Sequence, residues 1–112
     1  MKVFIENEPG SDQKNIYNEK TLKYKETFTV SRKYPFPYGF ILKTTSGDGD
    51  NLDCFIVTKQ KLKQGQIVEC EPMGIMEQIE DGKEDHNILA KILGEEVSIN
   101  EEVRNTLTEF VS

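Results

Sequence analysis

The first pattern along the chain is an alternation of apolar and polar side chains over residues 22–30. The apolar members on one parity are Leu22, Tyr24, Phe28 and Val30. Glu26 breaks the series once. Successive side chains of a β-strand point to opposite faces, so the alternation predicts an antiparallel strand with one face buried.

Short runs rich in aromatic and β-branched side chains predict further strands. Two of them, residues 38–44 and 52–58, are separated by the turn-forming sequence TSGDGDN, which indicates two strands joined by an acidic loop. Residues 65–71 and 74–76 form either another strand pair or one long strand interrupted at Pro72. Because proline lacks the N–H that a ladder needs, we expect an edge or a bulge there.

The last third of the chain changes its period. Residues 77–85 are polar with Gly82 as the turn residue, and residues 88–93 suit either a strand or a short helix. Ser98 and Glu101 match the S-x-x-E capping box of a helix start. Apolar side chains then recur at spacings of three and four, at Ile99, Val103, Leu107, Phe110 and Val111. Several short strands followed by one amphipathic helix predict a mainly β fold, a small antiparallel barrel on which the helix packs.

Length and charge narrow the classes of function. The 112 residues suit a single domain over residues 1–112, and the net charge of −6 disfavours a protein that binds the nucleic-acid backbone. The N-terminus lacks the pattern of a signal peptide, and no stretch approaches the roughly 20 apolar residues of a membrane span. We therefore expect a soluble cytoplasmic protein without a nucleic-acid or membrane partner. Cys54 and Cys70 lie in apolar stretches without metal-site spacing, so we expect two buried free thiols.

The most unusual local feature is a group of three carboxylates within six residues, Asp48, Asp50 and Asp53, at the turn that leads into the apolar strand. Crowded carboxylates either raise one another's pKa or are neutralised by a cation, and oxygen ligands suit a hard ion such as Mg²⁺. An EF-hand is excluded, because a lysine stands where its bidentate glutamate belongs. The plain alternative is a hydrophilic hairpin turn whose Asp and Gly residues serve the backbone conformation.

A second acidic group comprises Glu80, Asp81, Glu84 and Asp85. Such charge runs usually coat a solvated face. If the strand ending near Met76 lies beside the strand beginning near Leu52, however, both acidic loops emerge at the same end of the sheet and can share one cluster of ions. The sequence leaves that adjacency open.

Two blocks of the chain resemble the soluble (family I) inorganic pyrophosphatases, which hydrolyse diphosphate to two orthophosphates with Mg²⁺. The first block, similar to the family's YPxxYGFI and DGDPxD signature, is YPFPYGFI at residues 34–41, GDGDNLD at residues 47–53, and Thr58. The second block, similar to the family's PxG and DE...D segment, is PMG at residues 72–74 with Glu80, Asp81 and Asp85. The resemblance implies a five-stranded barrel of the OB type with flanking helices.

Carried over residue by residue, the resemblance implies a metal-assisted hydrolysis of diphosphate. The implied metal ligands are Asp48, Asp53 and Asp85 for the tightest ion, Asp53 for a second, Glu80 and Asp85 for a third, and Glu6 near a fourth. Asp50 would be the general base, Tyr38 would position the nucleophile and bind substrate, and Lys14 would contact a phosphate. Two ions about 4 Å apart would activate a bridging water for in-line attack on phosphorus. The implied cofactor is Mg²⁺, with Mn²⁺ as a substitute, and a homo-oligomer is compatible because bacterial members commonly form hexamers.

The sequence departs from the family pattern at charged positions. The family's upstream arginine aligns with Thr27, its glutamate after the substrate lysine with Ile16, and the lysine after its last metal aspartate with Asn87. The chain also stops at Ser112, short of the family's C-terminal Tyr-Lys pair. Losing two or three phosphate contacts would slow turnover by about 10³ to 10⁵ unless other residues compensate.

Candidates for compensation are Arg32, Lys33 and Lys43, whose plain interpretation is solvated surface charge. The leading hypothesis is a Mg²⁺-dependent diphosphatase, and the alternative is a non-catalytic pyrophosphatase-like domain that binds divalent metal or phosphate. A nucleic-acid-binding OB barrel is a third class, which the acidic composition disfavours.

Overall fold

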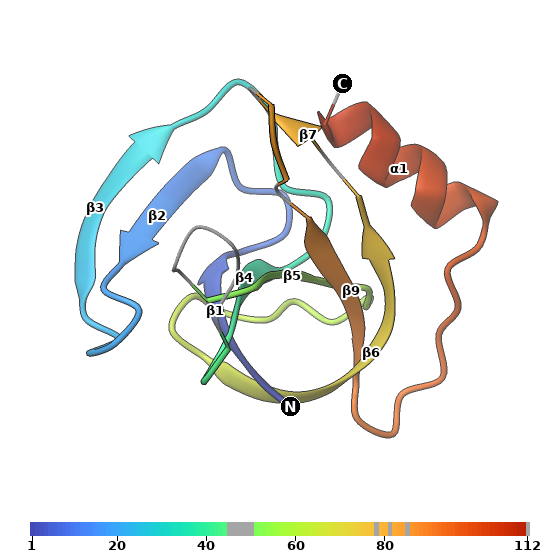
Figure 1. Cartoon of the computed structure of the whole chain (residues 1–112), viewed down its shortest axis with the longest axis horizontal. Helices are drawn as coiled ribbons and strands as arrows, with labels where there is room; N and C mark the ends of the chain where they lie inside the picture. The colour runs from blue at the N-terminus through green and yellow to red at the C-terminus, as the bar shows by residue number, and fades with distance from the viewer. Residues whose placement is uncertain (45–50, 78, 81, 85, 112) are drawn as a thin grey trace.

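The computed structural model describes residues 1–44, 51–77, 79–80, 82–84 and 86–111. Five strands close into a barrel in the order β1-β4-β5-β9-β6 (Figure 1). They are β1 (Lys2–Asn7), β4 (Tyr38–Ile41), β5 (Asp53–Ile56), β9 (Asn87–Ile92) and β6 (Ile67–Met76). Neighbouring strands are antiparallel except β5 and β9, which run parallel. The predicted five-stranded barrel of the OB type is confirmed, with one parallel pair that the sequence analysis did not foresee.

The interpretation of residues 22–30 as a half-buried strand is wrong. The strand β3 (Tyr24–Thr29) pairs only with β2 (Gln13–Tyr17), and all six of its residues are exposed. The two strands form a separate ribbon beside the barrel (Figure 1). In such a ribbon the alternation of side chains separates two faces of which neither is covered by a second sheet, so apolar residues such as Tyr24 and Phe28 stay exposed.

The remaining strands decide between the alternatives that the sequence left open. β6 is one long strand with a register shift between Pro72 and Gly74, which confirms the expected bulge. Residues 87–92 form the strand β9 rather than a helix. Between β6 and β9, β7 (Ile79–Glu80) and β8 (Lys83–Glu84) pair across a turn at Gly82, whose φ of 76° suits glycine.

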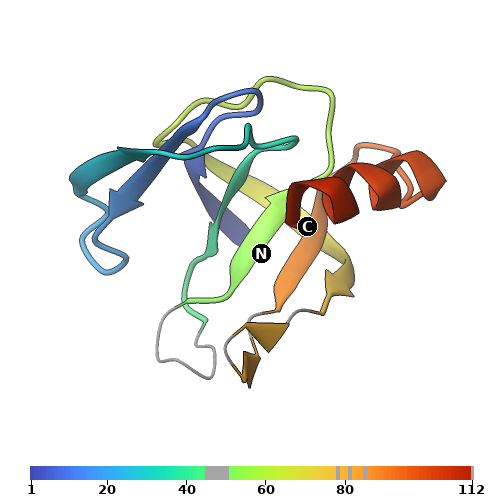
Figure 2. The ribbon, with the colours of Figure 1, turned by 90° about the horizontal axis from the view of Figure 1, so that it is seen from above.

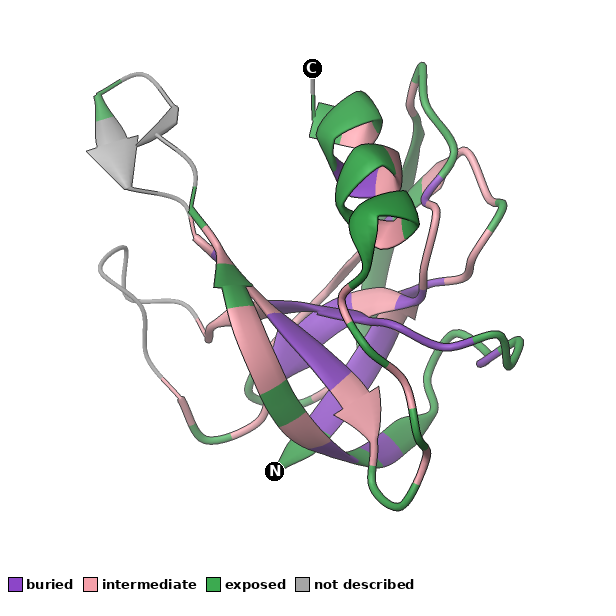
Figure 3. Cartoon of the chain, turned by 90° about the vertical axis from the view of Figure 1, so that its right-hand side faces the viewer, coloured by how far each residue is buried: buried purple, intermediate pink, exposed green. Residues whose placement is uncertain are grey.

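The helix α1 (Glu101–Val111) packs on the outside of the barrel (Figure 2). The predicted cap at Ser98 is wrong by two residues, because the Val103 N–H donates to Oδ1 of Asn100 at 2.9 Å. Asn100 is therefore the N-cap. Leu107 is the buried residue of the helix, and the partly buried Val103 and Phe110 pack against the same cluster. Most of the outward side of the helix is exposed (Figure 3). No helix in the described ranges is long and apolar enough to cross a membrane.

The wall of the barrel separates two apolar clusters. The inner cluster includes Val3, Ile5, Ile41, Cys54, Ile56, Val68, Cys70 and Ala90. The outer cluster, beneath α1, joins Tyr34, Phe55, Leu89 and Leu107. Cys54 and Cys70 are buried free thiols, as predicted, and burial raises the pKa of Cys70 to about 11.

The structure explains why residue 39, in the YGFI block, is a glycine. A Cβ at this position would collide with the main-chain carbonyl of Phe4, because β1 and β4 approach closely there. The block therefore brings the neighbouring Tyr38 close to β1, where Glu6 lies.

Candidate active site

Three predicted site residues gather on the outer side of the β1-β4-β5 wall. The register pairs Phe40 with Phe4 on one side and with Asp53 on the other, and it pairs Tyr38 with Phe55. Residues that alternate with these, such as Ile5 and Cys54, point into the barrel. A register shift between Ile5 and Asn7 places Glu6 in a bulge of β1. The geometry thus brings Glu6, Tyr38 and Asp53 together from three strands.

Glu6 lies in an acidic and half-buried environment. Burial, followed by the negative charges of Asp53 and Glu19, raises its pKa from 4.5 to about 8. A hydrogen bond from the Tyr17 main chain and the positive charge of Lys14 act in the opposite direction. The carboxylates in this place repel one another more than the single lysine offsets, which is the condition that a bound cation relieves.

Tyr38 is held between the carboxylates and the aromatic cluster under α1. Its ring stacks on Tyr34 with 5.3 Å between ring centroids and contacts Phe55 at 4.8 Å. Its pKa is well above the usual value, first because of burial and then because of the Asp53 charge. Tyr38 therefore keeps its proton and donates a hydrogen bond to the side chain of Asp53.

The ribbon is attached to β1 next to Glu6 through buried asparagines. Oδ1 of Asn7 accepts the Asn15 N–H at 2.7 Å, and Nδ2 of Asn15 donates to the Glu6 carbonyl at 2.9 Å. Asn7 and Asn15 are both nearly inaccessible to solvent. Lys14, adjacent to this joint, is exposed and lies close enough to Glu6 to lower its pKa. The joint therefore fixes the place of the lysine that the resemblance assigns to phosphate.

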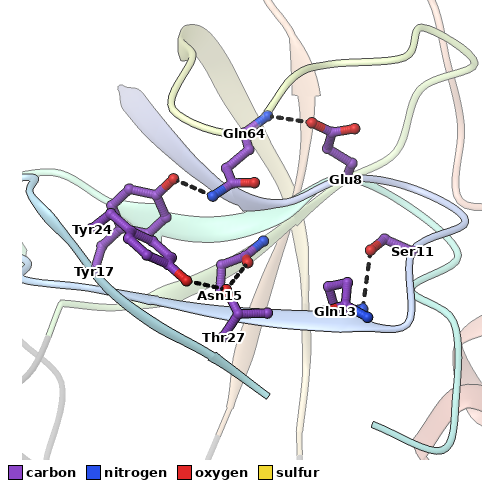
Figure 4. A pocket seen from close by; sticks show the side chains of 8 residues that line it. All are labelled: Glu8, Ser11, Gln13, Asn15, Tyr17, Tyr24, Thr27 and Gln64. Carbon is purple, nitrogen blue, oxygen red and sulfur yellow. Dashed lines mark hydrogen bonds between the residues drawn. The ribbon is translucent and has the colours of Figure 1, made fainter. Parts of the chain in front are cut away.

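A polar pocket of about 530 Å³ opens on the Asn15 side of the ribbon (Figure 4). Its side chains bond to one another: Thr27 Oγ1 donates to Asn15 Oδ1 at 2.7 Å, and Gln64 Nε2 donates to the Tyr17 hydroxyl at 2.6 Å. The Thr27 bond joins the two strands of the ribbon, and the Gln64 bond connects the ribbon to the segment before β6. Thr27 pairs with Asn15, whereas Lys14 pairs with Phe28 on the other face. The position aligned with the family's arginine thus lies on the opposite face of the ribbon from Lys14.

Some of the predicted site residues lie outside the part of the chain that the structure describes. These undescribed residues include Asp48, Asp50 and Asp85. Glu80 is described only as part of the backbone of β7. Among the residues that the structure describes, no three carboxylate, imidazole or thiol groups are close enough to hold a metal ion. The predicted ligand set of Asp48, Asp53, Asp85, Glu80 and Glu6 therefore stays a prediction.

The strand ending near Met76 does not lie beside the strand beginning near Leu52, which was the condition for the two acidic loops to share one cluster of ions. β5 and β6 are not neighbours, because β9 lies between them. The register nevertheless aligns Asp53 with Asn87, and Asn87 with Met76. The start of β5, the start of β9 and the end of β6 consequently lie at one end of the barrel.

Glu19 is a residue that sequence reasoning missed. It lies in the turn between β2 and β3, and its Oε1 accepts the Asn51 N–H at 2.9 Å, thirty-two residues away. Its charge also contributes to the raised pKa of Glu6. No motif contains it, and the only sequence signal is a single acid within a polar turn.

Arg32 and Thr58, which lie next to or within the first sequence block, form hydrogen bonds with other parts of the chain. Arg32, considered as a substitute phosphate ligand, donates from Nη1 to the Phe110 carbonyl at 2.6 Å. It thereby caps the C-terminus of α1, whose last turn has no basic residue of its own. Thr58 donates to Oε2 of Glu95 at 3.1 Å. Lys33 and Lys43 are exposed.

A sequence profile of the family described as inorganic pyrophosphatase matches residues 3–109. The chain belongs to this family. The inorganic pyrophosphatase of Sulfolobus acidocaldarius is 35% identical over 92 residues, which cover 80% of this chain and 53% of the relative. That of Mycoplasma pneumoniae is 36% identical over 94 residues, covering 82% and 51%. The chain thus spans about half the length of these pyrophosphatases.

Solved pyrophosphatase structures share the fold. The crystal structure from Neisseria gonorrhoeae superimposes with a TM-score of 0.78 at 25% identity, covering 98% of this chain and 68% of that one. The Thermus thermophilus structure has a TM-score of 0.85 at 23% identity, covering 98% and 69%. Membership of the pyrophosphatase family agrees with the resemblance of the two sequence blocks.

Proposed function

We propose that this chain hydrolyses inorganic diphosphate to two orthophosphates with Mg²⁺ as cofactor. Family membership supports the reaction. The observation that carries it is that Glu6 and Asp53 lie together in a half-buried place, where burial first and then the negative charge of Asp53 raise the pKa of Glu6 to about 8. An oxygen-only donor set with surplus negative charge fits a hard divalent cation. The proposal takes residues 1–112 as one cytoplasmic domain and allows a homo-oligomer.

The roles follow from the chemistry of each side chain. Asp48, Asp53 and Asp85, with Glu80 and Glu6 beside them, would hold the metal, which when bound activates water and neutralises charge on the phosphates. Asp50 accepts the proton of the attacking water.

Tyr38 and Lys14 complete this assignment. Tyr38, protonated because of its burial, keeps the Asp53 carboxylate oriented by a hydrogen bond. Lys14 contributes an ammonium group that pairs with a phosphate. In this proposal Tyr38 also helps to position the nucleophile, and both side chains bind the substrate.

The alternative is a non-catalytic domain that binds divalent metal or phosphate without turnover. Its supporting observation is the neutral character of three positions that are charged in the family pattern. Ile16 lies on the ribbon, Thr27 lies on the face opposite Lys14, and Asn87 is buried in β9. Thr27 and Asn87 cannot supply the positive charges that the family's arginine and lysine carry, and Ile16 cannot supply the carboxylate of the family's glutamate.

The decisive experiment is orthophosphate release from diphosphate with Mg²⁺, measured for the wild type and for Asp50→Asn, Asp53→Asn and the exposed control Glu96→Gln. We expect the two aspartate variants to lose about 10²-fold or more in kcat, while the control keeps wild-type kcat. Titration calorimetry with Mg²⁺ separates the alternative, which predicts binding without turnover. Wild-type release no faster than that of Asp50→Asn would remove the catalytic proposal.

A further inference from the structure

Glu19 joins two parts of the candidate site that are far apart in sequence. Its side chain extends from the turn between β2 and β3 to the main chain at Asn51, two residues before Asp53. The negative charges of Asp53 and Glu19 raise the pKa of Glu6, and the positive charge of Lys14, on β2, lowers it. The contact therefore connects the ribbon that bears Lys14 to the segment that leads into Asp53.

The turn that bears Glu19 is itself held firmly. Oδ1 of Asn18 accepts the N–H groups of Lys20 and Thr21 at 2.9 and 3.0 Å. The Asn18 N–H donates to the Lys23 carbonyl, and Leu22 takes the left-handed conformation that closes the turn, with φ of 60°. Because these local hydrogen bonds fix the backbone of the turn, the Glu19 side chain starts from a fixed place. Its contact with Asn51 can therefore fix the position of the Asn51 main chain.

A second set of hydrogen bonds holds the segment around Asn51. Oδ1 of Asn51 accepts the Thr44 N–H at 3.2 Å, and Oγ1 of Thr44 accepts the Leu52 N–H at 2.9 Å. These bonds join the two limbs leading out of β4 and into β5, but they do not relate those limbs to the ribbon. The bond from the Asn51 N–H to Glu19 supplies that relation.

We infer that Glu19 is a positioning residue: its carboxylate holds the main chain at Asn51 and so keeps Asp53 in place beside Glu6 and Lys14. This role rests on the proposed diphosphate hydrolysis at the same site. Glu19 touches neither the substrate nor the reacting atoms in this role, and it acts through Asn51. A charge-assisted hydrogen bond is stronger than a neutral one, which suits a contact that fixes the position of a chain segment.

The test compares Glu19→Ala, Glu19→Gln and the exposed control Glu96→Gln in the full chain. The first readout is amide hydrogen exchange at Asn51, followed by NMR in metal-free protein. We expect about tenfold faster exchange in Glu19→Ala, because the acceptor is lost, and near-wild-type exchange in Glu19→Gln, whose amide oxygen still accepts the bond. The second readout is diphosphate hydrolysis, with an expected fall in kcat of about tenfold for Glu19→Ala, a KM close to wild type and rescue by Glu19→Gln.

The outcomes separate this inference from the proposed function. Unchanged exchange at Asn51 in Glu19→Ala, or equal loss of kcat in Glu19→Ala and Glu19→Gln, would overturn the positioning role even in an active enzyme. A wild type that fails to hydrolyse diphosphate would overturn the proposed function together with the catalytic consequence drawn here. In that case the exchange measurement still decides whether Glu19 holds Asn51.

Discussion

Two elements cover the outer wall of the barrel, and they are held in different ways. α1 is held by apolar burial, with Leu107 at 2% exposure packed into the cluster of Phe55 and Leu89. The β2-β3 ribbon is held mainly by directional bonds from Asn15 to β1 and from Gln64 to Tyr17, together with a ring contact of 4.9 Å between Phe4 and Tyr17. Apolar burial is non-directional and supplies stability, whereas hydrogen bonds fix position. The helix therefore stabilises the fold, and the ribbon places Lys14 close to Glu6.

The largest expected effect tests the helix side of this comparison. Leu107→Ala should lower the free energy of unfolding by about 3 kcal/mol, because it leaves a cavity in the cluster under α1. Urea denaturation measures it, with Val111→Ala, at 40% exposure, as the control that should change little. Equal losses in the two variants would show that the helix is not held by burial.

A smaller loss of stability is expected on the ribbon side. Asn15→Ala removes the bonds to the Glu6 carbonyl and to Thr27 and should cost about 2 kcal/mol. It should also raise the KM for diphosphate, since Lys14 is displaced from Glu6. Asn105→Ala on the exposed face of α1 is the control. The positional role of the ribbon fails if Asn15→Ala changes stability but leaves KM and kcat at wild-type values.

The pH dependence of stability sharpens the contrast further. With the pKa of Glu6 near 8 in the metal-free fold and 4.5 as its ordinary value, the folded chain retains a proton that the unfolded chain releases between these values. Wild-type stability should therefore fall as pH rises from about 4.5 to 8. Glu6→Gln should lack this decline and gain on the order of 1 kcal/mol at pH 8 in EDTA. Parallel curves for the two proteins would contradict the buried acidic environment.

The smallest effect concerns the C-terminus of α1. Arg32→Ala removes the bond to the Phe110 carbonyl and should cost about 0.5 kcal/mol of stability. Its KM for diphosphate should stay within about twofold of wild type, since the side chain is engaged at the helix rather than at the carboxylates. Lys33→Ala is the matched neighbour, with no expected change in either quantity. A large rise in KM for Arg32→Ala alone would return this residue to the phosphate site.

The sequence predicts the barrel and the residues at its wall better than it predicts the ribbon. Short β-branched runs and the YGFI block locate β4 and β5 because these strands face a core on both sides. β3 shows the same alternation without a core, so periodicity predicts burial that the topology does not provide. Neither β1, whose apolar run of Val3, Phe4 and Ile5 is short, nor β2, which alternates weakly, is predicted from the sequence; both pair with later strands.

The residues of the candidate site likewise fall into those that the sequence predicted and those that it missed. Motif resemblance led to Tyr38, Asp53 and Glu6, which the structure brings together. Glu19 escaped, because its role depends on a contact across thirty-two residues that no local pattern encodes. The capping residue Asn100 was missed because the match of Ser98 and Glu101 to the capping box was preferred, although asparagine is also a favoured N-cap residue.

The most direct test of the central claim is anomalous diffraction from crystals soaked in Mn²⁺. The account predicts an anomalous peak coordinated by the Asp53 carboxylate together with Asp48 and Asp85, close to Glu6, and its loss in Asp53→Asn crystals. A soaked wild-type crystal without a peak at Asp53, from protein that still hydrolyses diphosphate in Mn²⁺, would contradict the assignment of the reaction to these carboxylates.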